Sequence, residues 1–302
     1  MSDFTATFWG VRGGYPVPGK DTVKFGGNTT CLQVRAGPHL IIIDAGTGIR
    51  ALGEELVAQR VQDQTPIMGT LLFTHGHHDH TQGLLFFEPL RLRDTVFHVF
   101  GPRVFGEDLG DMLRRSMLPP MRPVALREQP GIRVIQTVSG GQTILITEPG
   151  KLPAVADQGA DPEVPCEAAI VRVYHSSNHP KGGSLCYLIE YQGKRLVFAT
   201  DTEGYIGGDV LLGEFVRGVD MLVHDAEYTD SEYTGPPVAR QGYGHSTWKM
   251  AVAVGKKAQV KRLMLTHHHA RHDDAFLLEM EREAQAIFPP TFMAREGMTI
   301  EL

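Results

Sequence analysis

Short runs of apolar residues recur along the chain and predict buried β-strands. They lie at residues 32–34, 40–43, 71–73, 96–100, 170–173, 195–199, 221–223 and 262–265. Gly, Asn or Asp follows several of them closely. Runs this short, bounded by turn-forming residues, are typical of strands. Residues 35–39, which join the first two runs, are expected to form a hairpin turn.

Apolar residues at helical spacing predict helices in both halves of the chain. The first pattern starts at Ile49 and repeats at Leu52 and Leu56. The second follows Ser246-Thr247, an expected N-cap, and the third runs over residues 274–287. Strand runs that then alternate with helices in both halves indicate a sheet-on-sheet core with helices outside.

Two stretches fit this pattern poorly. Residues 106–130 carry Met112, Met117, Met121 and the pair Pro119-Pro120. They predict either a helical hairpin that packs methionine into the core or a flexible flap over a pocket. Residues 149–165 are acidic and rich in Pro and Gly, and we expect a surface loop there.

Composition and charge narrow the classes of function. The 302 residues carry a net charge of -6, so no overall basic field recruits nucleic acid. Three widely spaced cysteines argue against a disulfide framework and against a CxxC zinc site. The first residues lack the basic and apolar regions of a signal peptide, and no apolar run approaches the ~20 residues of a membrane span. We therefore expect a cytoplasmic protein that does not enter a membrane.

The segment at residues 74–80, with the sequence THGHHDH, carries the strongest chemical signal. It directly follows the apolar run Leu-Leu-Phe. Neutral imidazoles with one carboxylate form a donor set that zinc prefers. A loop that leaves a strand can turn His75 and His77 towards one metal ion and Asp79 and His80 towards another. The alternative, a histidine-rich surface turn, does not account for the buried strand before it or for the aspartate within it.

Further candidate ligands each follow a predicted strand. His179 follows residues 170–174, Asp201 follows 196–200 and His267 follows 263–266. Ligands at the ends of successive strands describe one rim of a sheet sandwich, and an aspartate can bridge two cations through its two oxygens. His175 is the alternative to His179.

The order HxHxDH, His, Asp, His resembles the metallo-β-lactamase superfamily. Six shorter motifs resemble its phosphodiesterase branch, which includes RNase Z and small-molecule cyclic phosphodiesterases. They are GVRG (10–13), GGNT (26–29), DAGTG (44–48), HPKGG (179–183), TDTE (200–203) and GHST (244–247). The resemblance spans nearly the whole chain. It implies one α/β domain over residues 1–302, an αββα sandwich of two mixed β-sheets flanked by helices.

The resemblance also implies roles for the candidate ligands. His75, His77 and His179 would hold one divalent metal ion, Asp79, His80 and His267 the other, and Asp201 would bridge them. Asp44 would support the metal loop through hydrogen bonds. Zinc is the expected metal, although this donor set also accepts manganese or iron.

A second pair of motifs concerns proton transfer. RNase Z-like enzymes carry HEAT and HST segments that supply a carboxylate and a histidine. Here the corresponding segments are residues 224–227, HDAE, and residues 245–247, HST. Asp225 stands where that glutamate would be, and Glu227 could replace it as the residue that orients His245. The alternative is that His245 merely caps the following helix.

These expectations lead to a functional hypothesis. We predict two-metal hydrolysis of a small phosphodiester such as a cyclic nucleotide, with Asp79, His245 and Asp225 as catalytic residues. The alternatives are thioester or lactone hydrolysis and RNase Z-type cleavage of tRNA 3′ ends. The acidic balance and the lack of an insertion resembling an RNA-grasping arm disfavour a nucleic-acid partner, and a homodimer is left open. His268, His269 and His272 are expected to be solvated or hydrogen-bonded, with a role behind the metal ligands as the alternative.

Overall fold

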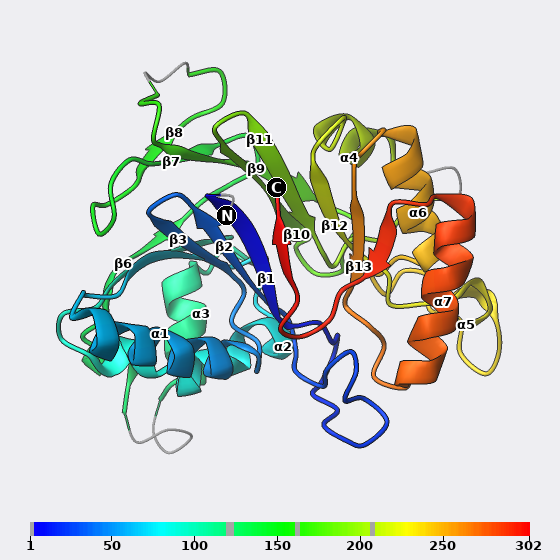
Figure 1. Ribbon diagram of the computed structural model, residues 1–302, viewed down its shortest axis with the longest axis horizontal. Helices are drawn as coiled ribbons and strands as arrows, with labels where there is room; N and C mark the ends of the chain where they lie inside the picture. Colours follow the sequence, from blue (N-terminus) through cyan, green and yellow to red (C-terminus); the bar gives the residue numbers. More distant parts are fainter. Residues whose placement is uncertain (1–2, 119–123, 161–163, 206–208) are drawn as a thin grey trace.

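The computed structural model describes residues 3–118, 124–160, 164–205 and 209–302 (Figure 1). Within these residues the strands form two sheets of mixed direction. The first has the order β15 (Thr299–Glu301), β1 (Phe4–Gly10), β2 (Cys31–Ala36), β3 (His39–Ile43), β4 (Met68–Leu72), β5 (Val96–Gly101) and β6 (Ile132–Thr137). The second has the order β14 (Thr291–Met293), β13 (Leu263–Thr266), β12 (Met221–Asp225), β11 (Lys194–Ala199), β10 (Ser184–Tyr191), β9 (Ala169–Ser176), β7 (Thr143–Ile146) and β8 (Ala154–Ala156).

Helices cover the outer faces of both sheets (Figure 1). The α-helices are α1 (Ile49–Asp63), α2 (His78–Thr81), α3 (Leu109–Ser116), α4 (Val210–Phe215), α5 (Asp230–Thr234), α6 (Trp248–Lys257) and α7 (Asp274–Ile287). Short 3₁₀ helices are η1 (Gln82–Phe86), η2 (Glu88–Arg91) and η3 (Leu126–Glu128). Helices α1 and α3 lie on the side of the first sheet, and α6 and α7 on the side of the second. The predicted αββα sandwich is therefore confirmed.

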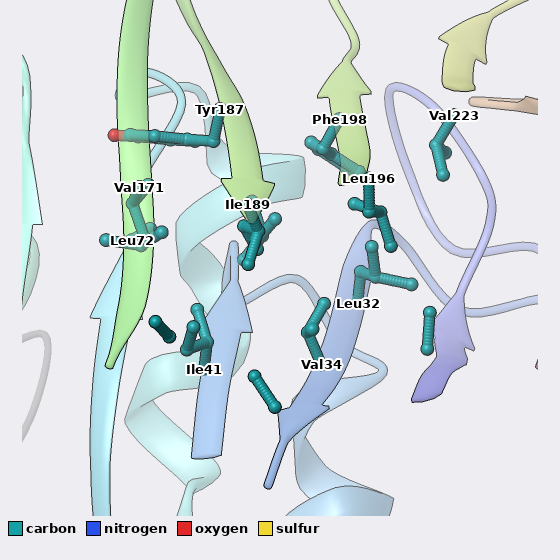
Figure 2. Close-up of a cluster of buried hydrophobic side chains, with 14 of the residues drawn as sticks. Leu32, Val34, Ile41, Leu72, Val171, Tyr187, Ile189, Leu196, Phe198 and Val223 are labelled. Atoms are coloured by element: carbon teal, nitrogen blue, oxygen red, sulfur yellow. The ribbon is translucent and has the colours of Figure 1, made fainter. Parts of the chain in front are cut away.

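Strand β3 shows how the sequence builds these layers. Its five residues are all buried, because both faces of the strand are covered. Ile41 and Ile43 point into the core between the sheets, whereas Leu40 and Ile42 pack towards α1. Figure 2 shows the core between the sheets, where Ile41 and other side chains of the first sheet face side chains of the second, such as Ile189. All eight apolar runs fall on strands, with ends shifted by up to three residues.

The first irregular stretch contains a helix, as one of its two interpretations predicted, and the second contains a short strand. Helix α3 occupies part of residues 106–130, and Met117 beyond its end is buried. Residues 119–123, with the Pro-Pro pair and the third methionine, lie outside the described residues, and the flap stays a prediction. Within residues 149–165, β8 pairs with β7, and residues 161–163 again lie outside the described residues. Among the described helices, none is long and apolar enough to cross a membrane.

The topology brings the carboxyl ends of strands from both sheets together. In the first sheet β3 and β4 are parallel, and in the second β11, β12 and β13 are parallel. Parallel neighbours end at the same edge of a sheet, and ligand sites of α/β proteins lie beyond such ends. Most of the predicted site residues leave the sheets at these ends, whereas His179 follows β9 and His245 precedes α6.

Candidate metal centre

Three of the site residues follow strands with an unusual backbone conformation. Asp44 follows β3, Asp201 lies just beyond β11 and His267 follows β13, with φ angles of 60°, 55° and 60°. Non-glycine residues rarely adopt positive φ, and each costs of order 1–3 kcal/mol. The surrounding hydrogen bonds stabilise this uncommon backbone conformation and so fix the directions of the three side chains.

The loop after β4 divides its residues between site and solvent. Helix α2 begins at His78, so Asp79 and His80 turn inward and are buried, while His78 itself is exposed. A Cβ at Gly76 would lie 2.0 Å from the Sδ of Met112 on α3, so a larger residue there would displace this methionine side chain. The α3 segment therefore packs directly on the loop of candidate ligands.

The first group of candidate ligands comprises His75, His77, His179 and Asp201, whose donor atoms all lie within 4.8 Å of one another. The Nε2 atom of His179 is 3.3 Å from the Nδ1 atom of His77. The Nε2 atom of His75 is 3.5 Å from Asp201 Oδ1. Three imidazoles and a carboxylate oxygen thus converge, which is a donor set for a borderline cation such as zinc.

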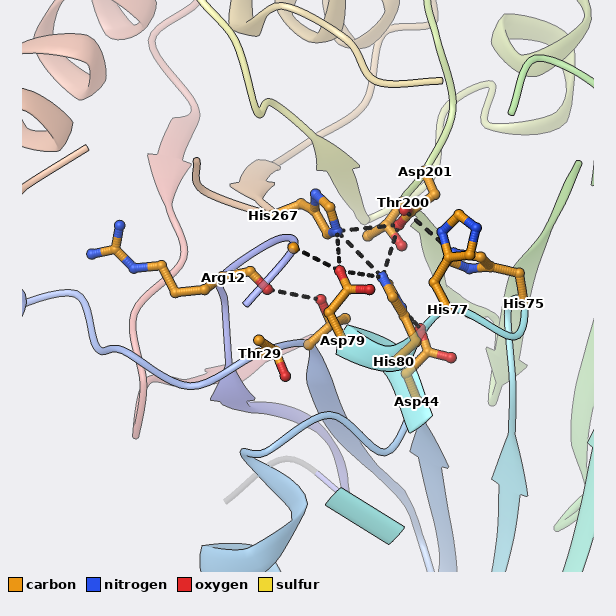
Figure 3. A network of polar contacts seen from close by, with 12 residues as sticks. Arg12, Thr29, Asp44, His75, His77, Asp79, His80, Thr200, Asp201 and His267 are labelled. Atoms are coloured by element: carbon orange, nitrogen blue, oxygen red, sulfur yellow. Dashed lines mark hydrogen bonds and ion pairs between the residues drawn. The ribbon is translucent and has the colours of Figure 1, made fainter. Parts of the chain in front are cut away.

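The second group comprises Asp79, His80 and His267. The Nε2 atoms of His80 and His267 lie 3.4 Å and 3.3 Å from Asp79 Oδ2 (Figure 3). Asp201 connects the two groups, because its Oδ2 atom is 3.1 Å from His80 Nε2 and 3.5 Å from His267 Nε2. Its two oxygens therefore face different groups, as a bridging carboxylate requires.

Carboxylates on the far side of the His80 and His267 rings show that this arrangement fits cations. His80 Nδ1 donates to Asp44 Oδ2 at 2.7 Å, and His267 Nδ1 lies 3.2 Å from Glu227 Oε2. A neutral ring that donates from Nδ1 presents a lone pair at Nε2. The two Nε2 atoms nevertheless lie only 3.2 Å apart. Two lone pairs at this distance repel, and a positive ion or a proton between them removes the repulsion.

The other group carries the same signature. His179 Nδ1 lies 3.2 Å from the Gly244 carbonyl oxygen, which leaves its Nε2 lone pair pointing towards His77. Among the described residues, His75 Nε2 and Asp201 Oδ2 are buried polar atoms without a hydrogen-bond partner. Buried polar atoms in proteins normally have a hydrogen-bond partner, so these two atoms indicate a site for a bound ligand.

Electrostatics distinguish the two groups. Burial lowers the pKa of His75 well below its ordinary value, and burial also lowers the pKa of His179, so both rings are neutral donors. Burial also opposes the charged form of His80 and His267, but Asp201 and other carboxylates outweigh it and raise the pKa of both rings. A proton therefore competes with a cation at the second group, and metal binding there releases protons.

A histidine and two carboxylates border the metal centre. His245 Nδ1 is 2.8 Å from Asp225 Oδ2 and 3.3 Å from Glu227 Oε2, and its ring stacks on His267 with centroids 4.9 Å apart. Burial opposes the charge, but Glu227 and Asp225 outweigh it and raise the pKa of His245 to about 9. The cap of α6 is Thr247, whose hydroxyl accepts from the Met250 N–H, so His245 is not the helix cap.

The structure brings all nine predicted site residues into one region. Both carboxylates reach His245, with Asp225 the closer, while Glu227 also contacts His267. His175 is exposed and lies 2.9 Å from the Gly182 carbonyl oxygen, outside both ligand groups. The sequence did not indicate that the Gly14 N–H donates to Asp79 Oδ2 at 2.8 Å. The feature that could have indicated this hydrogen bond is the glycine-rich segment after β1, whose backbone can approach a carboxylate closely.

The three histidines after the second-group ligand differ from the expectation in part. His268 is fully buried and lies 2.8 Å through Nε2 from the Ala294 carbonyl oxygen. His272 is buried too, and lies 2.9 Å from a Glu232 oxygen. The prediction of solvent exposure was therefore wrong for His268 and His272, because the turn after β13 folds back into the protein. The alternative prediction, that they are hydrogen-bonded, was confirmed.

Comparison with known proteins gives three findings. A family model described as a beta-lactamase superfamily domain matches residues 39–268. The chain is 33% identical over 124 residues to a ribonuclease Z of Lactococcus lactis, covering 36% of this chain and 38% of that protein. It is 27% identical over 272 residues to a ribonuclease Z of Metallosphaera sedula, covering 85% of this chain and 87% of that protein.

Solved structures support the same fold. The metallo-beta-lactamase fold protein YhfI from Bacillus subtilis matches with a TM-score of 0.65 at 14% identity, covering 98% of both chains. This chain spans only 38% and 32% of the length of the first two ribonuclease Z relatives that share more than 30% identity with it.

Proposed function

Because the chain belongs to the metallo-β-lactamase superfamily, we propose that it is a hydrolase of the ribonuclease Z-like branch, which uses two divalent metal ions to cleave phosphodiesters. The observation that carries the proposal is the placement of Asp201, a buried residue whose two oxygens face two separate groups of histidines. A carboxylate in that position serves two cations at once. Zinc is the proposed metal, and manganese or iron would fit the same donors.

The division of ligands follows from the two groups. His75, His77 and His179 would hold one ion, Asp79, His80 and His267 the other, and Asp201 both. Two such ions, when bound, supply activation of water and neutralisation of charge on the attacked centre.

The protein's own residues would orient these ligands and supply a proton. Asp44 holds the loop by accepting from Thr74 N–H and Thr74 Oγ1, both at 2.8 Å, and from His80. His245 has its Nδ1 engaged by two carboxylates, which leaves Nε2 as the atom that would protonate a leaving alkoxide.

We propose a small phosphodiester, such as a cyclic nucleotide, as the substrate. The acidic balance of the chain supports this choice, since binding of RNA depends on cationic contacts to phosphates. RNA is the second candidate, because relatives of this chain are named ribonuclease Z. Thioester or lactone hydrolysis is the third. The His245–Asp225 pair argues against a thioester, because a thiolate leaves without an acid.

One substrate panel tests the proposal. Metal-analysed protein is assayed on bis-(p-nitrophenyl) phosphate, cyclic nucleotides, a tRNA precursor with a 3′ extension, a thioester and a lactone. We expect the highest kcat/KM on a cyclic nucleotide, and loss of activity with a chelator that zinc restores. A preference for the tRNA precursor would support the second candidate. Turnover of only the thioester or lactone would contradict phosphodiester hydrolysis.

A further inference from the structure

A third cluster of metal-ligating side chains lies outside the centre described above. It consists of Glu232 on α5 together with His269 and His272 in the turn between β13 and α7. Their donor atoms lie within 4.8 Å of one another, and His272 Nε2 is 2.9 Å and 3.1 Å from the two oxygens of Glu232. We propose that this cluster, which the dinuclear centre does not use, is a separate binding site for a divalent transition-metal ion of the zinc type.

The turn that carries the two histidines is held rigidly. The His272 N–H donates to the His269 carbonyl oxygen at 3.0 Å, which closes the turn and brings the two ring centroids to 5.2 Å. The fully buried guanidinium of Arg12 donates to both carbonyl oxygens, at 2.6 Å to His272 and 3.3 Å to His269. The rings therefore reach one place without reorganisation of the backbone.

The carboxylate is positioned independently of the histidines. Glu232 is the third residue of α5, and its Oε2 atom accepts from the N–H and the hydroxyl of Thr229 in a capping box, at 2.8 Å and 2.9 Å. This leaves Oε1 as the oxygen available to a cation. On the other side of the cluster, the His272 ring stacks on Phe276 with centroids 4.2 Å apart.

The donor set and its surroundings suit zinc. Two histidines with one glutamate form a known zinc donor set, and such three-residue sites keep a fourth position for water. His272 is buried, whereas Glu232 and His269 are half-buried, so an ion can enter and retain water. The ring of Tyr228 separates the cluster from the dinuclear centre, because its centroid is 5.8 Å from that of His269 and 6.0 Å from that of His245. Since α5 and the start of α7 come from distant segments, a shared ion would cross-link them.

The test counts zinc in variants that leave the fold intact. Glu232 and His272 are unsuitable, because one caps α5 and the other is buried, so His269→Ala is the informative variant. The His269 side chain accepts only one hydrogen bond from the described residues, from the Arg271 N–H. His175→Ala is the matched control, since that histidine is exposed and outside every cluster.

We expect chelator-stripped wild-type protein to bind three zinc equivalents in equilibrium dialysis, as should His175→Ala, whereas His269→Ala should bind two. Equal binding by the wild type and folded His269→Ala would overturn the proposal. Asp201→Ala separates this site from the dinuclear centre. That variant should retain one equivalent, and zinc should raise its Tm, an effect that adding His269→Ala should abolish. If Asp201→Ala binds as many zinc equivalents as the wild type, the proposal of a dinuclear centre fails. The comparison of the wild type with His269→Ala then still decides whether the third cluster binds zinc.

Discussion

His245 provides the sharpest test of the proposed chemistry. Its Nδ1 atom faces Asp225 at 2.8 Å and Glu227 at 3.3 Å, and these carboxylates outweigh burial and raise its pKa to about 9. At neutral pH the ring is therefore protonated and can deliver the Nε2 proton. His245→Ala removes this acid. The ring is stacked beside His267 and is no member of the two proposed ligand groups, so both ions and the fold should be retained.

The expected loss of kcat in His245→Ala follows from the role of a positioned general acid. Such a group contributes about 10²–10⁴-fold to the rate. At 1.36 kcal/mol per factor of ten, this corresponds to roughly 3–5 kcal/mol of transition-state stabilisation. The loss should appear in kcat on an alkyl phosphodiester, whose leaving alkoxide needs a proton. It should shrink on a p-nitrophenyl ester, because nitrophenolate departs without protonation.

The assay compares kcat on the two esters, with zinc content measured for each variant. Asp225→Ala should show the same dependence on the leaving group, more weakly, because the acid remains but loses its closer partner. Glu227 also contacts the Nδ1 atom of His267 at 3.2 Å, so Glu227→Gln should chiefly weaken metal binding. An equal loss on both esters in His245→Ala would refute the acid role and assign His245 to substrate positioning. Loss of zinc from that variant would assign it to the support of the metal ligands.

Three further predictions follow from the same geometry. Asp201→Ala should remove both ions of the dinuclear centre, whereas His268→Ala should leave zinc content unchanged, because this ring contacts a backbone carbonyl oxygen instead; elemental analysis measures both. Tyr187→Phe removes a buried hydroxyl that donates to the Phe73 carbonyl oxygen at 2.6 Å, and should lower the free energy of unfolding by about 1–3 kcal/mol in urea denaturation. Only Cys166 should react with a thiol reagent in the native protein up to pH 9, because burial raises the pKa of the other two thiols; all three should react in denaturant.

Much of the fold could be predicted because local patterns and burial agree. Strand β3 has five buried residues in a row, and apolar runs this short, bounded by turn-forming residues, favour a strand covered on both faces. Helix α7 begins after Asp273, whose side chain accepts from the Phe276 N–H, and a cap of this kind is readable from the sequence. The stretch at 106–130 was harder, because methionine is compatible with several packings.

The sequence by itself determined which residue types form the candidate site, because HGHHDH and the later His, Asp and His each follow a recognisable strand. The tertiary structure decided which atoms face each other. Only the meeting of the segments that follow β11 and β4 shows that the two oxygens of Asp201 face different groups. Likewise, only the packing of α5 against the turn after β13 brings Glu232 to His272. Such contacts join residues far apart in the chain, and a local pattern carries no information on the distance between them.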